Sequence, residues 1–482
     1  MKLFQKDPAF YKGVFALALP IALQSLISIG VNMLDTIMVG SLGENALSAT
    51  SLANSFISIY HIFCMGLGMG ASVLVSRYWG MKKAAGGDEE KSANTAESTA
   101  GAVTAAAEAD RALKQTVCLM LRITLGLAAI FALLTLFIPS AIMRTYTSDS
   151  EIIRLGDIYF RWSVVTYFFL GTGLVSTIVL RSVGQVKLPL YVSIGAFFVN
   201  LGANYAFIFG KLGAPRMEVA GAALGTLIAR LFEAAMILGY LFGVDKKIRF
   251  RIRDLFMKTG SLLGEYIRIS IPVLVSDAIL AIGNNSVAMV IGHLGAAFVA
   301  ANAITSVTQQ LSTVVIQGVS QAGAIVTGQT LGLGDRHKTM DQGWMFFGLG
   351  LALGAISAAF IMAVSHPIIS TYKVSEETVK IAEQLMTAIS IIIIFRATNS
   401  IMTKGVLRGG GDTKMLMLAD NIFLWVLAIP FGILAGFVFH WPAFWIYVAL
   451  KSDDIVKTFW CLGRLKSEKW IKKISTGRKY NA

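Results

Sequence analysis

The sequence predicts an all-α membrane protein: twelve transmembrane helices in two six-helix bundles, related by a pseudo-twofold axis along the membrane normal. Three observations predict this fold class: an apolar composition, an internal repeat, and an uneven distribution of basic residues. The composition is 55% hydrophobic and only 15% charged, and the mean hydropathy is +0.67. Such values are typical of a polytopic membrane protein and not of a soluble chain.

The internal repeat spans about half of the chain. Leu180–Lys187 returns as Leu407–Lys414, 227 residues later. Leu19-Pro20 and the run 40–43 return 252 residues later, at 271–272 and 292–295. A repeat of this length in a membrane protein is typical of a two-lobed transporter with a cavity between the lobes. The two offsets differ by 25 residues, which predicts an insertion in the first repeat.

Apolar runs of about 20 residues match the thickness of a bilayer core. The run after the N-terminal lysines is too long for a cleavable signal, so we expect an uncleaved first helix. We expect twelve spans, at 14–37, 46–75, 116–142, 153–178, 187–210, 219–242, 264–291, 297–330, 342–365, 377–402, 414–438 and 441–463.

Lysine and arginine gather on one side of these spans. With the N-terminus in the cytoplasm, the cytoplasmic segments hold 29 of them and the outer segments hold 4. Basic residues are retained on the cytoplasmic side. The bias therefore predicts an even number of spans in a multi-pass protein of the plasma or inner membrane, with both termini cytoplasmic. Six spans per repeat then enter the membrane in the same direction, which places the expected axis along the membrane normal.

The predicted domains follow the repeat. The insertion in the first repeat lies at 84–110 and is rich in Ala, Glu, Ser and Thr. Because it has little apolar surface to bury, we expect a flexible cytoplasmic segment or a solvated helix. The predicted parts are an N-terminal six-helix lobe over 1–243, a basic cytoplasmic linker over 244–263, a C-terminal six-helix lobe over 264–463, and a basic cytoplasmic tail over 464–482.

Several function classes are disfavoured. The net charge of +14 comes from short segments between apolar runs, unlike a nucleic-acid-binding surface, so we expect no nucleic-acid partner. The sequence has no Walker A motif, and its three cysteines and five histidines form no metal-binding spacing. We also find no nucleophile–base or two-carboxylate arrangement of an enzyme. Uphill transport would therefore draw on an ion gradient or a partner ATPase.

Ionisable residues inside spans are the first functional candidates, because they are costly in a bilayer. Asp35 lies toward the outer end of the first span, and Asn32 lies three residues earlier on the same helix face. Asn200 and Asn204 on the fifth span are four residues apart, so their amides share a face. A carboxylate with amide oxygens suits Na⁺, and it also suits a proton on Asp35.

The second half carries a different polar set. Asp277 lies near the middle of the seventh span, Asn284 two turns later, and Asp420 in the inner part of the eleventh span. The first repeat has serine at the positions that align with the two aspartates. We expect these three residues, with Asn32, to line the substrate cavity; the alternative is a structural hydrogen-bonding role.

Two further groups of charged residues are interpreted as structural. Arg230 and Glu233 on the sixth span are three residues apart, which predicts an internal ion pair. The stretch Lys451–Lys457 is predicted to mark the point where the last span becomes amphipathic and leaves the bilayer. Neither group is assigned to the candidate site.

Two motifs resemble a known family. The run Ala18–Gly43, which contains Asp35, resembles the start of a multidrug and toxic compound extrusion (MATE) transporter. Gly405–Lys414 resembles the motif of that family before span eleven. The resemblance implies export of organic, often cationic compounds in exchange for Na⁺ or H⁺, by a V-shaped pair of six-helix bundles. It matches the cation aspartate of the family to Asp35, and its span-five polar pair to Asn200 and Asn204.

The expected function is therefore secondary active export of amphipathic, often cationic organic compounds, such as drugs and toxins, by antiport with Na⁺ or H⁺. We expect a monomer in the lipid bilayer, small organic substrates and no cofactor. Asp35, Asn200 and Asn204 would bind a metal only if the coupling ion is Na⁺. The alternative is a flippase for a lipid-linked precursor with the same superfamily architecture, for which a cavity rich in Arg and Lys would be expected.

Overall fold

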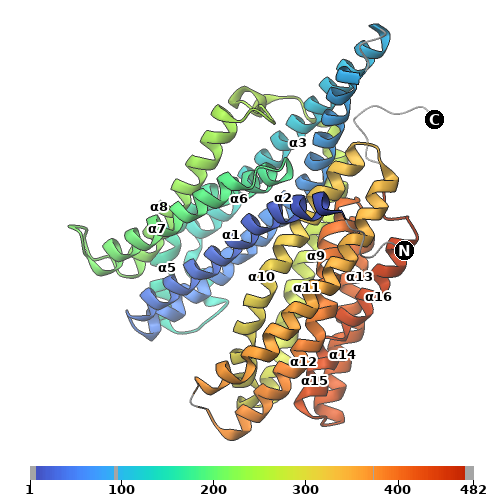
Figure 1. Ribbon diagram of the computed structural model, residues 1–482. Helices are drawn as coiled ribbons and strands as arrows, with labels where there is room; N and C mark the ends of the chain where they lie inside the picture. Colours follow the sequence, from blue (N-terminus) through green and yellow to red (C-terminus); the bar gives the residue numbers. More distant parts are fainter. Residues whose placement is uncertain (1–6, 92–95, 373, 473–482) are drawn as a thin grey trace. The chain divides into compact units, whose positions relative to one another are not determined.

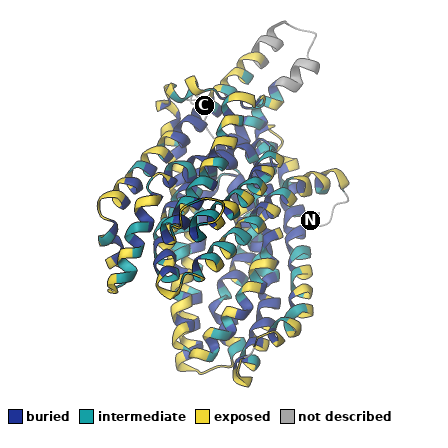
Figure 2. Ribbon diagram, turned by 90° about the vertical axis from the view of Figure 1, so that its left-hand side faces the viewer, coloured by how far each residue is buried: buried dark blue, intermediate teal, exposed yellow. Residues whose placement is uncertain are grey.

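The computed structural model describes residues 7–91, 96–372 and 374–472, and the side chains of these residues except 86–102. This described part consists of helices and their connections, and it contains no strand (Figure 1). The prediction of an all-α fold is confirmed. Buried residues (dark blue) lie along the inner faces of the helices and exposed residues along the outer faces (Figure 2).

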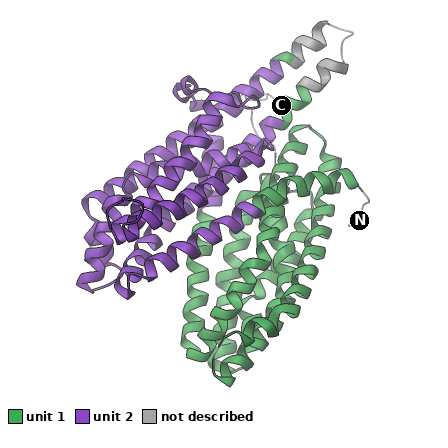
Figure 3. Ribbon diagram, turned by 60° about the vertical axis from the view of Figure 1, so that its left-hand side comes forward, with its two compact units in different colours: residues 1–22, 80–103, 275–475 green, residues 23–79, 104–274, 476–482 purple. Residues whose placement is uncertain are grey.

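Contacts divide the chain into two compact units, which are coloured separately in Figure 3. Of the described residues, unit 1 contains 7–22, 80–91, 96–103, 275–372 and 374–472. Unit 2 contains residues 23–79 and 104–274. Each unit is therefore built mainly from one sequence repeat. The lobe boundaries predicted from the repeat, 1–243 and 264–463, stay a prediction.

Unit 2 holds most of the first repeat. Its helices α5 and α6 form a span that bends by 59° at a short break. The helices with residues in this unit are α1 (Pro8–Gly40), α2 (Glu44–Lys91), α3 (Ala96–Phe137), α4 (Pro139–Arg144), α5 (Ser150–Ser163), α6 (Thr166–Ser182), α7 (Lys187–Phe209), α8 (Val219–Gly239), the turns η1 (Tyr240–Val244) and η2 (Ile252–Phe256), and the start of α9 (Gly260–His293).

Unit 1 holds most of the second repeat. Several of its helices contain π-helical turns, which widen the helix locally. Besides the rest of α9, its elements are α10 (Ala296–Gly332), α11 (Arg336–Ser370), α12 (Glu376–Ser400), η3 (Ile401–Leu407), α13 (Thr413–Ile422), η4 (Phe423–Ala428), α14 (Ile429–Ile433), η5 (Leu434–Val438), α15 (Ala443–Leu450) and α16 (Ser452–Lys466).

The described helices account for the predicted spans. Ten are long and apolar enough to cross a membrane, and the bent pair α5–α6 is an eleventh candidate. The last predicted span corresponds to α15 and α16, which are separated by a break at Lys451. Six spans in each repeat give the twelve-helix, two-bundle architecture that the sequence predicts.

The first halves of α1 and α9 pack with the opposite repeat. In unit 1, the ring of Phe10 lies 5.1 Å from that of Phe346, centroid to centroid. In unit 2, the Tyr266 hydroxyl donates to the Leu67 carbonyl oxygen at 3.0 Å. The unit boundaries fall at 22/23 and 274/275, shortly after Pro20 and Pro272. The repeated Leu-Pro and Ile-Pro motifs therefore mark the points where the two helices change unit.

The second copy of the glycine-rich motif is held by the chain that follows α16. Trp470 is fully buried and lies directly over Gly410, where a Cβ atom would collide with the indole ring. The Lys472 amide donates to the Gly410 carbonyl oxygen at 3.0 Å. Asp412 accepts from Arg464 at 2.6 and 3.0 Å. The predicted tail over 464–482 thus begins with residues packed on unit 1; residues 473–482 lie outside the described part.

Candidate functional site

Asp35 and the asparagine pair meet inside unit 2. Asp35 lies on α1, and Asn200 and Asn204 lie one helical turn apart on α7. The Asn204 Nδ2 group donates to Asp35 Oδ1 at 2.6 Å, and it lies 3.3 Å from Asn200 Oδ1. The two asparagines are buried, with exposed fractions of 4% and 1%, and Asp35 is half-buried. The structure thus brings together all three residues that the sequence assigned to the coupling ion.

The neighbouring helix α8 leaves room for this arrangement. A Cβ atom added to Gly225 would collide with Asn204 Oδ1, so glycine is required for the close approach of α8 to this amide. Asn204 Oδ1 is buried and has no hydrogen-bond partner among the residues that the structure describes. An unpaired amide oxygen is costly in an apolar interior, and it is available to a cation or to a donor group.

The charged groups near Asp35 are paired elsewhere. On α8, Arg230 forms the predicted ion pair with Glu233, at 2.7 Å, which confirms that interpretation. The charge of Arg230 acts on Asp35 over a longer distance. Within the described residues, Asp35 makes no ion pair, and its close partners are neutral amides. A carboxylate in such surroundings favours the uptake of a cation or a proton.

Asn32 takes no part in the amide–carboxylate contact. Its side chain is exposed, one turn before Asp35 on α1, and its carbonyl oxygen accepts from Thr36 Oγ1 at 2.8 Å. Among the described residues, no group of three or more His, Cys, Asp or Glu side chains could hold a metal ion. A Na⁺ ion at Asp35 would therefore depend on amide oxygens for its remaining protein ligands.

The predicted residues of the second half lie in unit 1, apart from the Asp35 set. Asp277 on α9 lies 3.4 Å from Arg408, which has a side chain only 5% exposed. Asn284, two turns later, is exposed. Asp277 is thus part of an ion pair, and Asn284 makes no contact with it. Their assignment to a substrate cavity stays a prediction.

Asp420 lies in a charge cluster that the sequence analysis missed. Its Oδ1 atom is 3.3 Å from Lys457 Nζ, and its Oδ2 atom accepts from Ser276 at 3.2 Å. Lys457 Nζ also donates to Asp453 Oδ2 at 3.0 Å. These charged side chains are buried against other helices of unit 1, and the expectation that the stretch Lys451–Lys457 leaves the bilayer stays a prediction. The i,i+4 spacing of Asp453 and Lys457 was the available signal.

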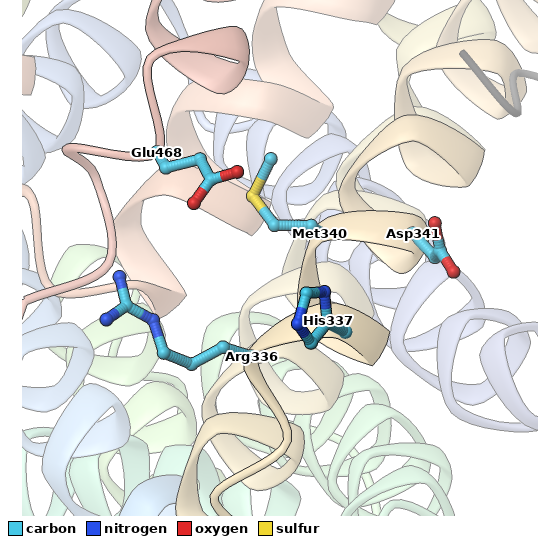
Figure 4. Close-up of a pocket in the computed structure, with 5 residues that line it drawn as sticks. All are labelled: Arg336, His337, Met340, Asp341 and Glu468. Atoms are coloured by element: carbon cyan, nitrogen blue, oxygen red, sulfur yellow. The ribbon is translucent and has the colours of Figure 1, made fainter.

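A surface pocket of about 500 Å³ lies at the start of α11 in unit 1. It contains none of the site residues predicted from the sequence, and it has charged groups of both signs. Figure 4 shows the residues that line it: Arg336, His337, Met340, Asp341 and Glu468.

Curated relatives of this chain include multidrug resistance proteins. Over 452 residues the chain is 26% identical to the multidrug resistance protein NorM of Burkholderia vietnamiensis, covering 89% of this chain and 86% of the relative. A probable multidrug resistance protein NorM of Thermotoga maritima is 25% identical over 480 residues, with 97% and 95% coverage.

Solved structures agree with these relatives on the fold. A Vibrio cholerae MATE transporter superimposes with a TM-score of 0.82 at 16% identity, covering 96% of this chain and 98% of that one. A Pyrococcus furiosus transporter of the MOP superfamily gives a TM-score of 0.79 at 18% identity, covering 97% and 98%. The sequence profile of the MatE family matches residues 20–86, 91–206 and 272–434. The chain belongs to this family, the MATE transporters, whose members are membrane transporters and not enzymes.

Proposed function

We propose that this protein exports small amphipathic, often cationic organic compounds in exchange for one cation, Na⁺ or H⁺, that binds at Asp35. The observation that carries the proposal is that, among the described residues, the close partners of Asp35 are neutral amides. A carboxylate without a cationic partner is costly to keep charged inside a membrane protein. It therefore favours states in which a proton, a Na⁺ ion or a cationic substrate group is bound.

Exchange follows from competition for this carboxylate. If the coupling cation and the substrate cannot both occupy Asp35, binding of one promotes release of the other. Alternating access of the two bundles then converts an inward gradient of the cation into outward movement of the compound. The names of the NorM relatives, which are multidrug resistance proteins, support organic compounds as substrates.

The test is efflux of a fluorescent cationic dye from proteoliposomes under separately imposed Na⁺ and pH gradients. We expect wild-type efflux under one of the gradients, and loss of gradient-driven efflux in Asp35→Asn with some dye binding retained. Glu151→Gln is a matched control, because it removes one carboxylate of an exposed ion pair in the same unit. Wild-type efflux by Asp35→Asn under both gradients would refute the coupling site.

The proposed location is the plasma or inner membrane, with both termini in the cytoplasm. The basis is the excess of Lys and Arg in the segments on that side. A reporter protein fused after Ala482 should fold and signal from the cytoplasm. A signal from the outer side would contradict the even number of spans.

The alternative, a flippase for a lipid-linked precursor, has less support. An anionic headgroup would need basic side chains that are free to bind it. Two of the buried basic residues in unit 1, Arg408 and Lys457, already form ion pairs with aspartates. Protein-dependent translocation of a labelled pyrophosphate lipid in the same proteoliposomes, without dye efflux, would favour the flippase.

A further inference from the structure

The last span is interrupted in its middle part. Helix α15 ends at Leu450, α16 begins at Ser452, and Lys451 between them has φ −120° and ψ 17°. Asp453 and Asp454 occupy the first turn of α16. Charged residues at a broken transmembrane helix are costly unless they are paired, and such breaks are typical of ion and substrate sites in transporters.

Lys457 links two carboxylates at this break. Its ammonium lies 3.0 Å from Asp453 Oδ2 on its own helix and 3.3 Å from Asp420 Oδ1 on α13. The side chains of all three residues are less than a tenth exposed. The second oxygen of Asp453 is buried and has no hydrogen-bond partner in the described part of the chain. An ammonium has three donors, so the lysine engages both carboxylates at once.

The other charged groups around the cluster are two carboxylates, Asp454 and Asp277, and four bases, which belong to helices α9, α12 and α16, to η3 and the residue after it, and to the break itself. Asp454, one residue from Asp453, accepts from Asn399 Nδ2 on α12 at 2.8 Å. The charges of Arg396 on α12 and of Lys451 act on Asp454. The charge of Lys404 on η3 interacts with the charges of Asp420 and Asp277. Asp277 forms an ion pair with Arg408, the residue that directly follows η3. Lys457 is the base in direct contact with Asp420 and Asp453.

We propose that Lys457 is a built-in counter-cation of the second bundle. Its ammonium occupies the position between Asp420 and Asp453 where a mobile cation would otherwise have to bind. The lysine is covalently attached and cannot leave, so both carboxylates keep a cationic partner throughout the transport cycle. The second bundle therefore binds no coupling ion of its own.

The consequence is a stoichiometry of one coupling cation per cycle, bound at Asp35. This consequence rests on the proposed function, whereas the role of Lys457 does not. Asp35 has amide partners and must take its cation from solution; Asp420 has an ammonium in place. Removing the lysine should therefore create a cation site in a bundle that has none.

The experiment measures thermal unfolding of the purified protein in detergent, in the Asp35→Asn background, which removes the first site. Na⁺ is exchanged for choline at constant ionic strength, and the pH is varied separately. We expect the unfolding midpoint of Asp35→Asn alone to be independent of Na⁺, and its pH dependence, which the other titratable groups set, is the baseline. With Lys457→Met added, the midpoint should rise with Na⁺ or fall more steeply than this baseline with rising pH, because a cation or proton now binds to the folded state.

Two variants control for loss of folding. Lys457→Arg keeps the charge and should behave as the Asp35→Asn background does. Lys457→Met with Asp453→Asn removes one charge of each sign and should fold, and its cation response should be weaker than that of Lys457→Met because one carboxylate is left in place of two. If Lys457→Met unfolds under all conditions but the double variant folds, charge neutralisation by the lysine is supported.

Three results would overturn the proposal. One is a Na⁺ response in Asp35→Asn alone, which would mean that the second bundle already binds a cation. Another is a folded Lys457→Met variant whose unfolding midpoint responds to Na⁺ and to pH as that of the Asp35→Asn background does. The third is failure of the double variant to fold, which would show that the lysine is needed for its packing and not for its charge. Wild-type efflux by Asp35→Asn would refute the proposed function and leave these outcomes unaffected.

Discussion

Asp35 in unit 2 and Asp420 in unit 1 are carboxylates within membrane-spanning helices, but their partners differ. Asp35 accepts a hydrogen bond from the amide of Asn204 at 2.6 Å. Asp420 lies 3.3 Å from the ammonium of Lys457 and accepts from Ser276. The first carboxylate has neutral partners, and the second has a permanent cationic partner.

The difference separates two uses of buried charge. A carboxylate with a fixed cation is compensated in every state of the protein, so it contributes to a stable bundle and not to ion exchange. A carboxylate with amide partners is compensated only while a mobile cation or proton is bound. A pair of related repeats can therefore keep similar helices and still divide stability and coupling between them.

The largest expected effect is on stability. Asp420→Asn leaves Lys457 with one carboxylate in place of two, and should lower the free energy of unfolding by about 3 kcal/mol. Asp35→Asn removes a charge without a fixed partner and should change it by less than about 1 kcal/mol. Thermal unfolding of both variants in one detergent, pH and salt tests this. Equal losses for the two aspartates would remove the distinction between the sites.

The next effect concerns the asparagines. Asn204→Ala removes the donor to Asp35 and should raise the half-saturating concentration of the coupling cation about tenfold or more. Asn200→Ala should have a smaller effect, because its amide contacts Asn204 at 3.3 Å. Initial rates of efflux against the concentration of the driving cation measure both. A larger defect for Asn200→Ala would mean that its oxygen, and not the Asn204 amide, binds the ion.

A smaller effect is expected from the helix that supports Asn204. Gly225→Ala places a methyl group where Asn204 Oδ1 lies, so the amide must shift away from Asp35. Overpacking of this kind costs about 1 kcal/mol or more, which corresponds to a loss of apparent cation affinity of about fivefold. Gly202→Ala on α7 is the matched control, because its new methyl group meets open space. Equal effects of the two changes would indicate a loss of helix flexibility.

Much of the fold could be predicted from the sequence, because the lengths of apolar runs and the basic loops are local signals. The pairing of Asn200 with Asn204 could also be predicted, since residues four apart share a helix face. The proximity of Asp35 to this pair was expected through the resemblance to the family. The structure agrees, with Asn204 in contact with Asp35.

The Lys457 cluster could not be predicted from the sequence in the same way. Its two carboxylates come from different helices, and Asp420 lies 37 residues before Lys457 in the sequence. A run of charged residues near the end of an apolar span resembles an exit into water when judged by hydropathy. Hydropathy does not distinguish a polar side chain that faces water from one that faces another charged helix.

The smallest expected effect lies at the insertion of the first repeat. Helix α2 extends to Lys91 and α3 begins at Ala96, and the side chains of residues 86–102 lie outside the described part. Ala85 and Ala109, near its two ends, are buried. Deletion of the whole predicted segment, 84–110, would therefore also remove packed residues.

A deletion of 88–106, with a short Gly/Ser linker in its place, keeps the buried alanines and removes only the distal part. We expect dye efflux and unfolding temperature close to those of the wild type, because the counterpart in the second repeat is about 25 residues shorter and still joins two spans. Restoring these residues in scrambled order is the control for length. If the deletion abolishes efflux at normal protein levels and the scrambled sequence does not restore it, the insertion has a sequence-specific role in transport. The functional difference between the repeats would then include this insertion as well as the different partners of Asp35 and Asp420.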